Sequence, residues 1–401
     1  MPHIITSGAD DHIPVSNADC APAHLIKAET WITSCCGGDD GWGQVKPFLF
    51  VRLTMSDGQT GWGEAFVLPC RETAVAEIIH ALADALTDLE DLTPWALRDR
   101  VAQVADKHRG LDYSAATSAL EMALWDIRGK NAQKPLYEML GGAHATRIPV
   151  YANIWSETQW RATELATRAT QLKAQGYTAI KVHPLLNHDL EEAVGAVATV
   201  RAAIGPDMHL MVDMDAKGDL DSAISFAKSI APYAPYWLEE PTDGAEIDLL
   251  AQVSRDADLR IVTGERQFSL AHFRGILRAQ GAHILNPDIA GLGGLLDMLD
   301  LSRLAHASGV ALSPHCWNSM TVAASAMLHV CAAIPNTEMA EIYPEYIAHG
   351  ARFASVSFTL HGAEAALSAT PGLGVAMDVA ALQACTVNYK QSHLSPKGAH
   401  L

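Results

Sequence analysis

The sequence predicts an α/β chain in which an α+β module precedes a TIM-like barrel, and three observations favour this fold class. The hydrophobic pattern changes near residue 148, where short apolar runs begin to alternate with amphipathic stretches. About eight such runs occupy about 200 residues, close to the about 250 that such a barrel typically needs. Three acids, Asp213, Glu239 and Glu265, end successive runs at intervals of 26 residues (239 − 213 and 265 − 239), enough for one strand, one turn and one crossover helix.

Residues 22–145 are predicted to form the α+β module, after a flexible tail over residues 1–21. The first half of the module contains strand-like runs in HLIKAETWIT, FLFVRLTM and TGWGEAFV. The last two runs flank Ser56-Asp57-Gly58, a sequence typical of a hairpin turn. From about residue 71 the pattern becomes helical, as in LEMALWDIRGK. Strands followed by helices are typical of an α+β arrangement.

Residues 146–364 are predicted to form the barrel, with strands in IPVYA, AIKVH, HLMVD, YWLE, RIVTG, HILN, VALSP and TEMAEI. Several crossovers close with a glycine just before the next strand, the residue that commonly terminates a helix. A doubly wound open sheet is the alternative, but no GxGxxG follows the first strand. Residues 365–401 return to short β-like and polar segments, and we expect them to fold back on the first module.

The composition argues against several classes of function. The formal net charge of −18 disfavours a protein that follows nucleic-acid phosphates, although a bound dication and local lysines can still attract an anionic substrate. The seven cysteines include no CxxC pair, so neither a zinc knuckle nor a disulfide framework is indicated. The chain shows no secretory leader and no apolar run of membrane-spanning length. We therefore expect a cytoplasmic protein with no nucleic-acid or membrane partner.

The three equally spaced acids are expected at the C-terminal strand ends, which form the active-site face of a barrel. Carboxylates that close successive parallel strands would converge there, and three anionic oxygen ligands suit a hard dication such as Mg²⁺. Any one of these acids alone would be better explained as a helix cap or a solvated loop charge. Their common register favours a metal site.

Other candidate residues end the remaining barrel strands. Lys181 and His183 are two residues apart, so both side chains point to the same face of their strand, where basic residues are poor core residues. Asp288 and His315 end two consecutive strands, so the carboxylate can bond one ring nitrogen, fix the tautomer and raise the basicity of the other nitrogen. Glu341 ends the last strand. A solvated edge strand or a structural histidine is the simpler alternative, but their place in one series favours catalysis.

The chain resembles the enolase superfamily and, within it, the mandelate racemase-like branch. The resemblance covers roughly residues 22 to 395 and rests on the order and spacing of motifs that are each weak alone. These motifs are GWGE (61–64), ALWDIRGK (123–130), LEEP (238–241), TGE (263–265), NPDIAGLGG (286–294) and SPHCW (313–317). The resemblance implies an α+β capping domain, completed by the C-terminal segment, over a modified (β/α)₇β barrel.

Carried over one position at a time, the resemblance implies three Mg²⁺ ligands, Asp213, Glu239 and Glu265. It also implies a set of catalytic residues at the other strand ends, namely Lys181, His183, Asp288, His315 and Glu341. Asp215 and Trp317 are expected to contact the substrate. The implied substrate is a small carboxylate, and the implied assembly is a homo-oligomer.

Two positions depart from the pattern of the family. His183 stands where the second lysine of a Lys-x-Lys pair is common, and it can accept an α-proton or protonate a leaving hydroxyl. We expect the charge of Lys181 to lower the pKa of His183, which would leave the ring partly neutral near pH 7. Asp215 occupies a position that is often Asn. If the strand continues past Asp213, Asp215 points to the same face and contacts a substrate hydroxyl or Lys181.

The chemistry that the resemblance implies begins with abstraction of the proton α to a carboxylate, with Lys181 and His183 on one face and His315 on the other. The leading hypothesis is Mg²⁺-dependent dehydration of an acid sugar to a 2-keto-3-deoxy acid. The alternative is a racemase, an epimerase or a lactone cycloisomerase on the same scaffold.

A metal-dependent hydrolase is disfavoured because its ligands are usually histidines. A binding protein that has lost activity is disfavoured because every expected catalytic position carries a competent residue. Specificity is expected to depend on capping loops such as residues 34–46.

Overall fold

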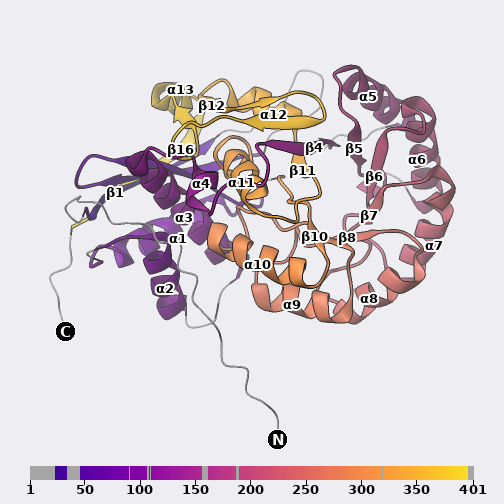
Figure 1. Ribbon diagram of the computed structural model, residues 1–401, viewed down its shortest axis with the longest axis horizontal. Coiled ribbons are helices and arrows are strands. Elements are labelled where there is room, and N and C mark those ends of the chain that lie inside the picture. The colour runs from indigo at the N-terminus through magenta and orange to yellow at the C-terminus, as the bar shows by residue number, and fades with distance from the viewer. Residues whose placement is uncertain are drawn as a thin grey trace, which may run out of the picture.

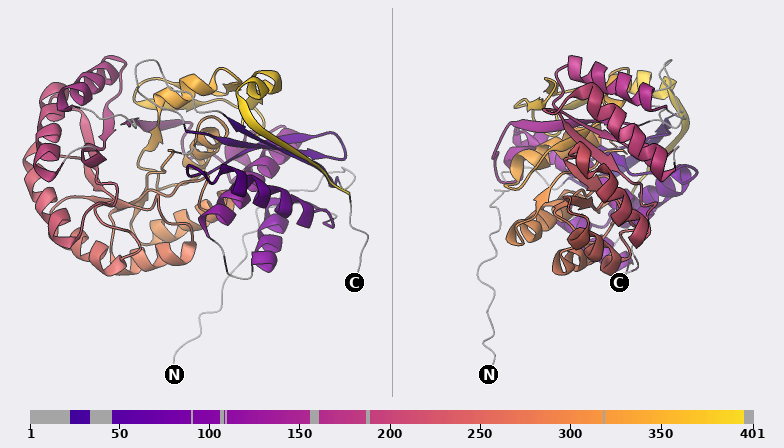
Figure 2. Two further views of the ribbon diagram at one scale, coloured as in Figure 1. Left: turned by 180° about the vertical axis from the view of Figure 1, so that it is seen from behind. Right: turned by 90° about the vertical axis from the view of Figure 1, so that its right-hand side faces the viewer.

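The computed structural model describes residues 23–33, 46–89, 91–105, 108, 110–155, 161–186, 189–317 and 319–395. Within these residues a mixed α/β capping module lies beside a barrel whose outer side is covered by helices (Figure 1, Figure 2). The predicted tail, residues 1–21, lies outside the described residues, as does most of the predicted specificity loop, residues 34–45.

The capping module is an antiparallel sheet covered by helices. Its strands, in the order β16-β1-β2-β3, are β16 (Thr386–His393), β1 (Leu25–Thr33), β2 (Leu49–Met55) and β3 (Thr60–Ala65). The hairpin turn predicted between β2 and β3 is present: Gly58 has φ +87°, and its N–H donates to the Met55 carbonyl at 2.9 Å. The helices of this module are α1 (Glu72–Ala85), α2 (Pro94–Ala105), α3 (Leu111–Ala132) and the short α4 (Leu136–Met139).

The glycines of the GWGE motif let α3 approach β3 at backbone distance. A Cβ added to Gly61 would lie 2.0 Å from the Ala123 carbonyl oxygen, and one added to Gly63 would lie 1.9 Å from that of Ala119. Because real side chains do not tolerate such distances, only glycine fits at these two positions. The motif therefore sets how closely the longest helix of the capping module packs on its sheet.

The barrel consists of parallel strands, each followed by a helix. The strands are β4 (Arg147–Ile154), β5 (Ala179–Val182), β6 (His209–Asp213), β7 (Trp237–Glu239), β8 (Ile261–Thr263), β9 (Ile284–Leu285), β10 (Ala311–Leu312) and β11 (Ala340–Ile342). The helices are α5 (Ala162–Ala174), α6 (Leu190–Ile204), α7 (Leu220–Ile230), α8 (Ile247–Asp256), α9 (Leu270–Ala279), α10 (Leu295–Ala307) and α11 (Val322–Ala333), with short 3₁₀ turns at η1 (Pro184–Leu186) and η2 (Ala231–Tyr233). This arrangement confirms the predicted (β/α)₇β barrel with its capping domain. No helix in the part of the chain that the structure describes is long and apolar enough to cross a membrane.

Hydrogen bonds close the barrel between β10 and β11. β11 pairs in parallel with β4, and the remaining neighbours run in sequence from β4 to β10. The Leu312 amide donates to the Asn336 carbonyl at 2.8 Å, and the Glu338 amide donates to the Leu312 carbonyl at 2.7 Å. A small apolar cluster that includes Tyr151 and Trp237 fills the interior. The barrel is therefore a packed core, and polar chemistry is confined to its ends.

The C-terminal segment runs from the barrel back to the capping sheet. After β11 come α12 (Pro344–Gly350), β12 (Ala354–Val356), β13 (Phe358–Leu360), β14 (Glu364–Leu367), β15 (Val375–Met377) and α13 (Val379–Ala384). β14 pairs antiparallel with β4, and β16 pairs antiparallel with β1 along most of its length. In Figure 2 the yellow β16 lies alongside the indigo β1. The predicted domain boundaries, at residue 145 between the capping domain and the barrel and at residue 364 between the barrel and the C-terminal segment, stay predictions.

Two buried acids of the capping module cap helices of the barrel. Glu64 on β3 accepts the amides of Met320 at 2.7 Å and Ala323 at 2.8 Å, at the start of α11. Glu121 on α3 accepts the Leu296 amide at 2.9 Å, at the start of α10. The free N–H groups of a helix N-terminus favour a negative oxygen at this position. The Glu64 contacts fix the β10–α11 loop, which carries residues 313–317, against the capping module, and the Glu121 contact does the same for the β9–α10 connection.

His80 of α1 joins the N-terminal and C-terminal strands of the capping sheet. Its ring nitrogens lie 3.0 Å from Thr30 Oγ1 on β1 and 2.9 Å from Ser392 Oγ on β16. Burial lowers the pKa of His80 to about 4, and the positive charge of Lys390 lowers it further, against a smaller opposite effect of Glu77. The ring is therefore neutral in the folded protein at neutral pH.

We expect the protein to lose stability as the pH falls from 6.5 to about 4, because over this range unfolded His80 binds a proton that folded His80 does not. The loss attributable to this residue is at most ~3 kcal/mol. Urea unfolding of wild type and His80→Gln across this pH range measures it. The variant should lose this part of the pH dependence, whereas identical pH profiles for the two proteins would contradict the assignment.

Candidate active site

The three equally spaced acids lie together at the C-terminal end of the barrel. Asp213 ends β6 and Glu239 ends β7, where the parallel register places the two residues side by side. Glu265 follows the end of β8 by two residues. One carboxylate oxygen from each of the three lies within 4.8 Å of the other two. This is the spacing that a shared cation requires.

The charges of this cluster fit a divalent cation. Burial raises the pKa of Asp213 to about 6, to which the charge of Asp215 adds, and burial raises the pKa of Glu239 well above its ordinary value. Buried carboxylates this close destabilise one another unless a positive charge lies among them. An all-carboxylate donor set suits a hard dication. Asp213, Glu239 and Glu265 are the residues that would hold it.

Lys181 lies within the acidic cluster and is fully buried. Its ammonium contacts Glu239, lies 2.8 Å from Glu341 Oε1 and lies 3.5 Å from Asp213 Oδ2. Burial lowers the pKa of Lys181, but the charges of Glu239 and Glu341 outweigh it and hold the pKa well above its ordinary value. Lys181 is therefore an amine enclosed by carboxylates.

His183 is held between an amide and two carboxylates. Its Nε2 lies 3.0 Å from Asn153 Oδ1, and its Nδ1 lies 3.1 Å from Asp215 Oδ1 and 3.5 Å from Asp213 Oδ2. Burial and Lys181 lower the pKa of His183, but Asp215 and Asp213 outweigh them and raise it. The predicted lowering of this pKa by Lys181 is present, but the predicted net outcome, a lowered pKa, is wrong because the charges of Asp215 and Asp213 outweigh it.

Asp215 reaches the site by a turn and not by continuation of the strand. β6 ends at Asp213, and Asp215 has φ +53°, in the left-handed region. Its amide donates to Asp213 Oδ1 at 2.8 Å, which holds the turn in place. The strand does not continue to Asp215, so the condition for its predicted orientation is not met, and its side chain contacts His183. Its predicted contact with a substrate hydroxyl stays a prediction.

His315 and Asp288 form a buried pair on the other side of the cluster. The two residues make a parallel bridge between the ends of β9 and β10, and His315 Nδ1 lies 2.8 Å from Asp288 Oδ2. His315 Nε2 lies 3.0 Å from Glu265 Oε2 and 3.7 Å from Glu341 Oε2. Burial lowers the pKa of His315, but Glu265 and Glu341 raise it well above its ordinary value.

Asn153, at the end of β4, is a site residue that the sequence reasoning missed. Its Nδ2 donates to Glu341 Oε1 at 2.6 Å and to Tyr343 Oη at 2.8 Å, so its Oδ1 is left to accept from His183. The amide thereby fixes a proton on His183 Nε2, and the other ring nitrogen, Nδ1, faces Asp215. The available signal was its position: Asn153 ends the first barrel strand, as the other candidates end later strands.

A cavity of about 330 Å³ opens onto these groups. Trp317, predicted to contact substrate, lines it together with His183, Asp215, Glu265 and His315. The remaining lining residues are Phe66, Leu68, Leu111, Trp155, Arg266, Phe268 and Tyr343. Lys181, Asp213, Glu239, Asp288 and Glu341 lie behind this lining, among the buried polar residues. The cavity therefore exposes both histidines and one of the three clustered acids to a ligand.

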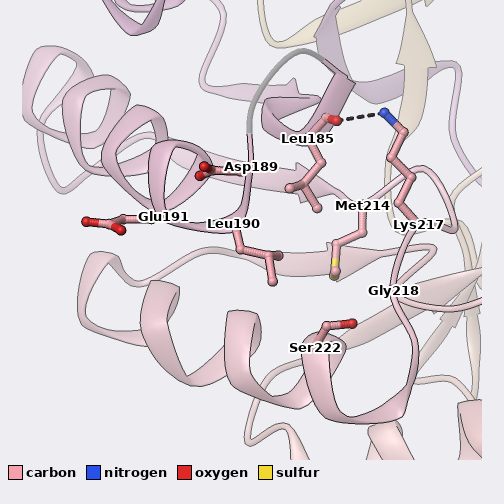
Figure 3. Close-up of a pocket in the computed structure, with 8 residues that line it drawn as sticks. All are labelled: Leu185, Asp189, Leu190, Glu191, Met214, Lys217, Gly218 and Ser222. Carbon is pink, nitrogen blue, oxygen red and sulfur yellow. Dashed lines mark hydrogen bonds between the residues drawn. The ribbon is translucent and has the colours of Figure 1, made fainter.

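A larger, more open depression of about 520 Å³ lies outside this site, between the starts of α6 and α7 (Figure 3). Its Lys217 donates to the Leu185 carbonyl at 2.6 Å, as Figure 3 shows, and Asp189 caps α6 by accepting the Glu192 amide at 2.9 Å. Met214 reaches this depression from between Asp213 and Asp215. Lys217, Asp189 and Ser222 are thus engaged in local structure, whereas His183, His315 and Glu265 line the smaller cavity.

Comparison with family models shows which protein family the chain belongs to. Residues 42–141 match the family model described as the Mandelate racemase / muconate lactonizing enzyme, N-terminal domain, and residues 164–381 match the one described as Enolase C-terminal domain-like. The chain therefore belongs to the enolase superfamily, in the branch of mandelate racemase and muconate lactonizing enzyme.

The individual relatives include a dehydratase and a cycloisomerase. The chain is 28% identical over 351 residues to a D-galactonate dehydratase of Ralstonia pickettii (strain 12J), an alignment covering 83% of this chain and 89% of the relative. It is 29% identical to a 3,6-anhydro-alpha-L-galactonate cycloisomerase of Streptomyces coelicolor (strain ATCC BAA-471 / A3(2) / M145), over 74% of this chain and 80% of the relative. A solved structure of an enolase from the environmental genome of the Sargasso Sea superposes with a TM-score of 0.90 and 37% identity, over 93% of this chain and 100% of that chain.

Proposed function

We propose that the protein is a Mg²⁺-dependent dehydratase that converts an acid sugar to a 2-keto-3-deoxy acid. The observation that carries the proposal is the placement of two histidines, each beside a carboxylate, on two sides of one acidic cluster and facing one cavity. The names of the dehydratase relative and of the cycloisomerase relative support the same first step, loss of the proton α to a carboxylate. A bound dication would stabilise the negative charge that develops on the substrate carboxylate.

The residues of the chain then supply positioning and proton transfer. Lys181 lies behind the cavity, where its ammonium contacts Glu239 and Glu341 and holds these two acids in place. His315, oriented by Asp288, exchanges protons on one face. His183, whose Nε2 is bound to Asn153 and whose Nδ1 lies 3.1 Å from Asp215 Oδ1, is assigned the role of the acid that donates a proton to the leaving group.

Dehydration follows from this distribution of protons. The C2–H proton goes to the base, the C3–O bond breaks with its electron pair on oxygen, and the oxygen leaves as water after taking a proton from the acid. The resulting enol tautomerises to the 2-keto-3-deoxy acid. Without loss of a group at C3, the same step followed by return of a proton to the opposite face would give racemisation or epimerisation, and cycloisomerisation would in addition require an intramolecular C–O bond to form or break. These remain the alternative.

The test is a screen of mono- and diacid sugars with Mg²⁺, with 2-keto acid detected by semicarbazide and substrates followed by NMR in D₂O. We expect a keto-acid product from wild type and a loss of about 100-fold or more in elimination for His183→Ala. His306→Ala, which changes a histidine in the last turn of α10, is the matched control and should keep wild-type activity. Deuterium at an inverted C2 with no keto acid would overturn the dehydratase proposal in favour of the racemase.

A further inference from the structure

His183 presents one ring nitrogen to two carboxylates. Asn153 Nδ2 already donates to two other side chains, so Asn153 Oδ1 accepts from His183 Nε2, 3.0 Å away, and Nε2 carries a hydrogen. The other ring nitrogen, Nδ1, lies 3.1 Å from Asp215 Oδ1 and 3.5 Å from Asp213 Oδ2. Three side chains that can each bind a metal ion therefore converge where β5 and β6 end.

These three side chains meet the geometric requirement for a shared cation. One ligand atom from each of His183, Asp213 and Asp215 lies within 4.8 Å of the other two. The side chains of His183 and Asp213 are 6% and 1% exposed, and that of Asp215 is 15% exposed. The set is therefore built into the protein and is not a group of solvated surface acids.

One carboxylate oxygen of the set lacks a partner among the described residues. Asp215 Oδ2 is buried, and no described residue forms a hydrogen bond with it. The Asp215 amide donates to Asp213 Oδ1 at 2.8 Å, so the turn holds this carboxylate in place. A buried acceptor without a partner is unfavourable, because it has lost its water and gained nothing in return. A cation bound by the three side chains would remove this cost.

Lys181 neutralises this set only in part. Its Nζ lies 3.5 Å from Asp213 Oδ2, but its closer contacts are with Glu239 and with Glu341 Oε1 at 2.8 Å. The charge of Lys181 is therefore shared with acids outside the set. Asp213 and Asp215 keep an excess of negative charge, which a dication would balance.

The donor atoms of this set suit a different metal from that of the all-carboxylate set. One imidazole nitrogen and two carboxylate oxygens suit Zn²⁺, whereas Mg²⁺ prefers oxygen ligands alone. A histidine that binds a metal through one ring nitrogen commonly has the other fixed by a hydrogen bond, as Asn153 fixes Nε2 of His183. The free atom of His183 is thus the one that faces the two acids.

The set arises at the two positions where the sequence departs from the pattern of the family. A lysine is common in place of His183, and an asparagine is common in place of Asp215. An ammonium offers no lone pair to a cation, and a neutral amide is a weaker ligand than a carboxylate. The second set therefore follows from residues of this chain and not from the pattern of the family.

We propose that His183, Asp213 and Asp215 form a second metal site, which binds Zn²⁺ in preference to Mg²⁺ while Mg²⁺ occupies the all-carboxylate set. Asp213 belongs to both sets and would be shared by the two ions. Zn²⁺ at His183 Nδ1 would occupy the one ring nitrogen left for proton transfer, because Nε2 is bound to Asn153. Zn²⁺ therefore inhibits elimination. The inhibition rests on the proposed function, whereas the binding of the ion does not.

The experiment measures binding of the metal alone to the full chain, so that it does not depend on a substrate. Protein in excess Mg²⁺ is titrated with Zn²⁺ by calorimetry, and the bound Zn²⁺ and Mg²⁺ are counted by equilibrium dialysis. We expect wild type to bind Zn²⁺ without losing Mg²⁺. His183→Gln and Asp215→Asn should each weaken Zn²⁺ binding about tenfold or more, because each change removes one ligand.

Matched variants separate the two sites. Glu265→Gln should weaken Mg²⁺ binding and keep Zn²⁺ binding, since Glu265 belongs only to the all-carboxylate set. His183→Gln should do the reverse. His306→Gln makes the same change at an exposed histidine of α10, and it should alter neither affinity. Circular dichroism on each variant establishes that it is folded before binding is compared.

The inference would be overturned if wild type bound no Zn²⁺ in the presence of Mg²⁺, or if His183→Gln bound it equally well. Loss of both ions in Glu265→Gln would also overturn it, because the Zn²⁺ would then belong to the all-carboxylate set. These outcomes are separable from failure of the proposed function. Zn²⁺ that binds as expected to a protein that converts no acid sugar would uphold the site and refute the dehydratase. On a confirmed substrate, elimination at full rate with Zn²⁺ bound would refute the inhibition.

Discussion

Replacing Glu265 with Gln is expected to abolish turnover, with activity falling by about 100- to 1000-fold or more, while the barrel stays folded. The change removes one of the three anionic oxygens that lie within 4.8 Å of one another, and an amide is a weaker ligand for a hard dication. Titration of Mg²⁺ into the variant by calorimetry should show an affinity at least about tenfold lower than that of wild type. The binding measurement does not depend on identifying the substrate.

Glu338→Gln is the matched control for this experiment. Glu338 precedes β11 at the opposite, N-terminal end of the barrel, where it contacts Tyr236 and lies 2.9 Å from a terminal nitrogen of Arg260. Catalytic residues are not expected at that end, since barrel active sites lie at the C-terminal strand ends. The control should keep Mg²⁺ affinity and turnover. If EDTA-treated wild type retained full activity, the role of the metal would be refuted altogether.

The barrel strands were predictable because each one has a recognisable local sequence pattern. The runs IPVYA to TEMAEI are short, apolar and separated by amphipathic helices, and each corresponds to one barrel strand from β4 to β11. The local sequence pattern predicted the ends of helices less reliably. Glycine was expected to terminate the helix before β9, but Gln280 adopts the left-handed conformation at φ +55°, one residue before Gly281.

The site was predictable where spacing along the chain fixes spacing in the barrel. Asp213 and Glu239 end neighbouring strands in register, so equal intervals led to adjacent carboxylates. The environment of His183 was not predictable, because it depends on a turn that returns Asp215 toward the ring. Asn153 was missed for a different reason: a neutral amide leaves no charge pattern, and its role arises only from three simultaneous hydrogen bonds.

The buried lysine shows how the charges of this site depend on one another. Lys181 contacts Glu239 and Glu341. A cation held by Asp213, Glu239 and Glu265 would therefore share Glu239 with the lysine. Asn286 Nδ2 donates to Glu239 Oε1 at 2.8 Å and Trp237 Nε1 donates to Glu239 Oε2 at 3.0 Å, so Glu239 is held in place on every side. Such a buried network stabilises the site only when every partner is present.

Replacing His315 with Asn is expected to stop proton exchange on its face of the substrate, with a loss of about 100-fold or more. Its ring is the group that can move a proton on the side of the acidic cluster opposite His183, and an amide has no comparable basicity. Solvent-deuterium exchange at C2, followed by NMR on a confirmed substrate, measures this directly. Wild-type exchange in the variant would refute the role of His315.

Asp288→Asn is expected to cause a smaller loss of about tenfold or more by imposing the wrong tautomer on His315. Asp288 Oδ1 already accepts the Ala290 amide at 2.8 Å, and its Oδ2 faces His315 Nδ1 at 2.8 Å. In the variant the amide oxygen keeps the Ala290 bond, so the amide nitrogen must face Nδ1 and donate to it. The proton of the neutral ring then moves to Nε2, the nitrogen that faces Glu265 and the cavity, and the ring can no longer accept a proton there. Asp300→Asn, at a position of α10 where the acid pairs with Arg98 and Arg303, should leave exchange unchanged. An equal loss in both variants would show that the Asp288 effect is not one of tautomer.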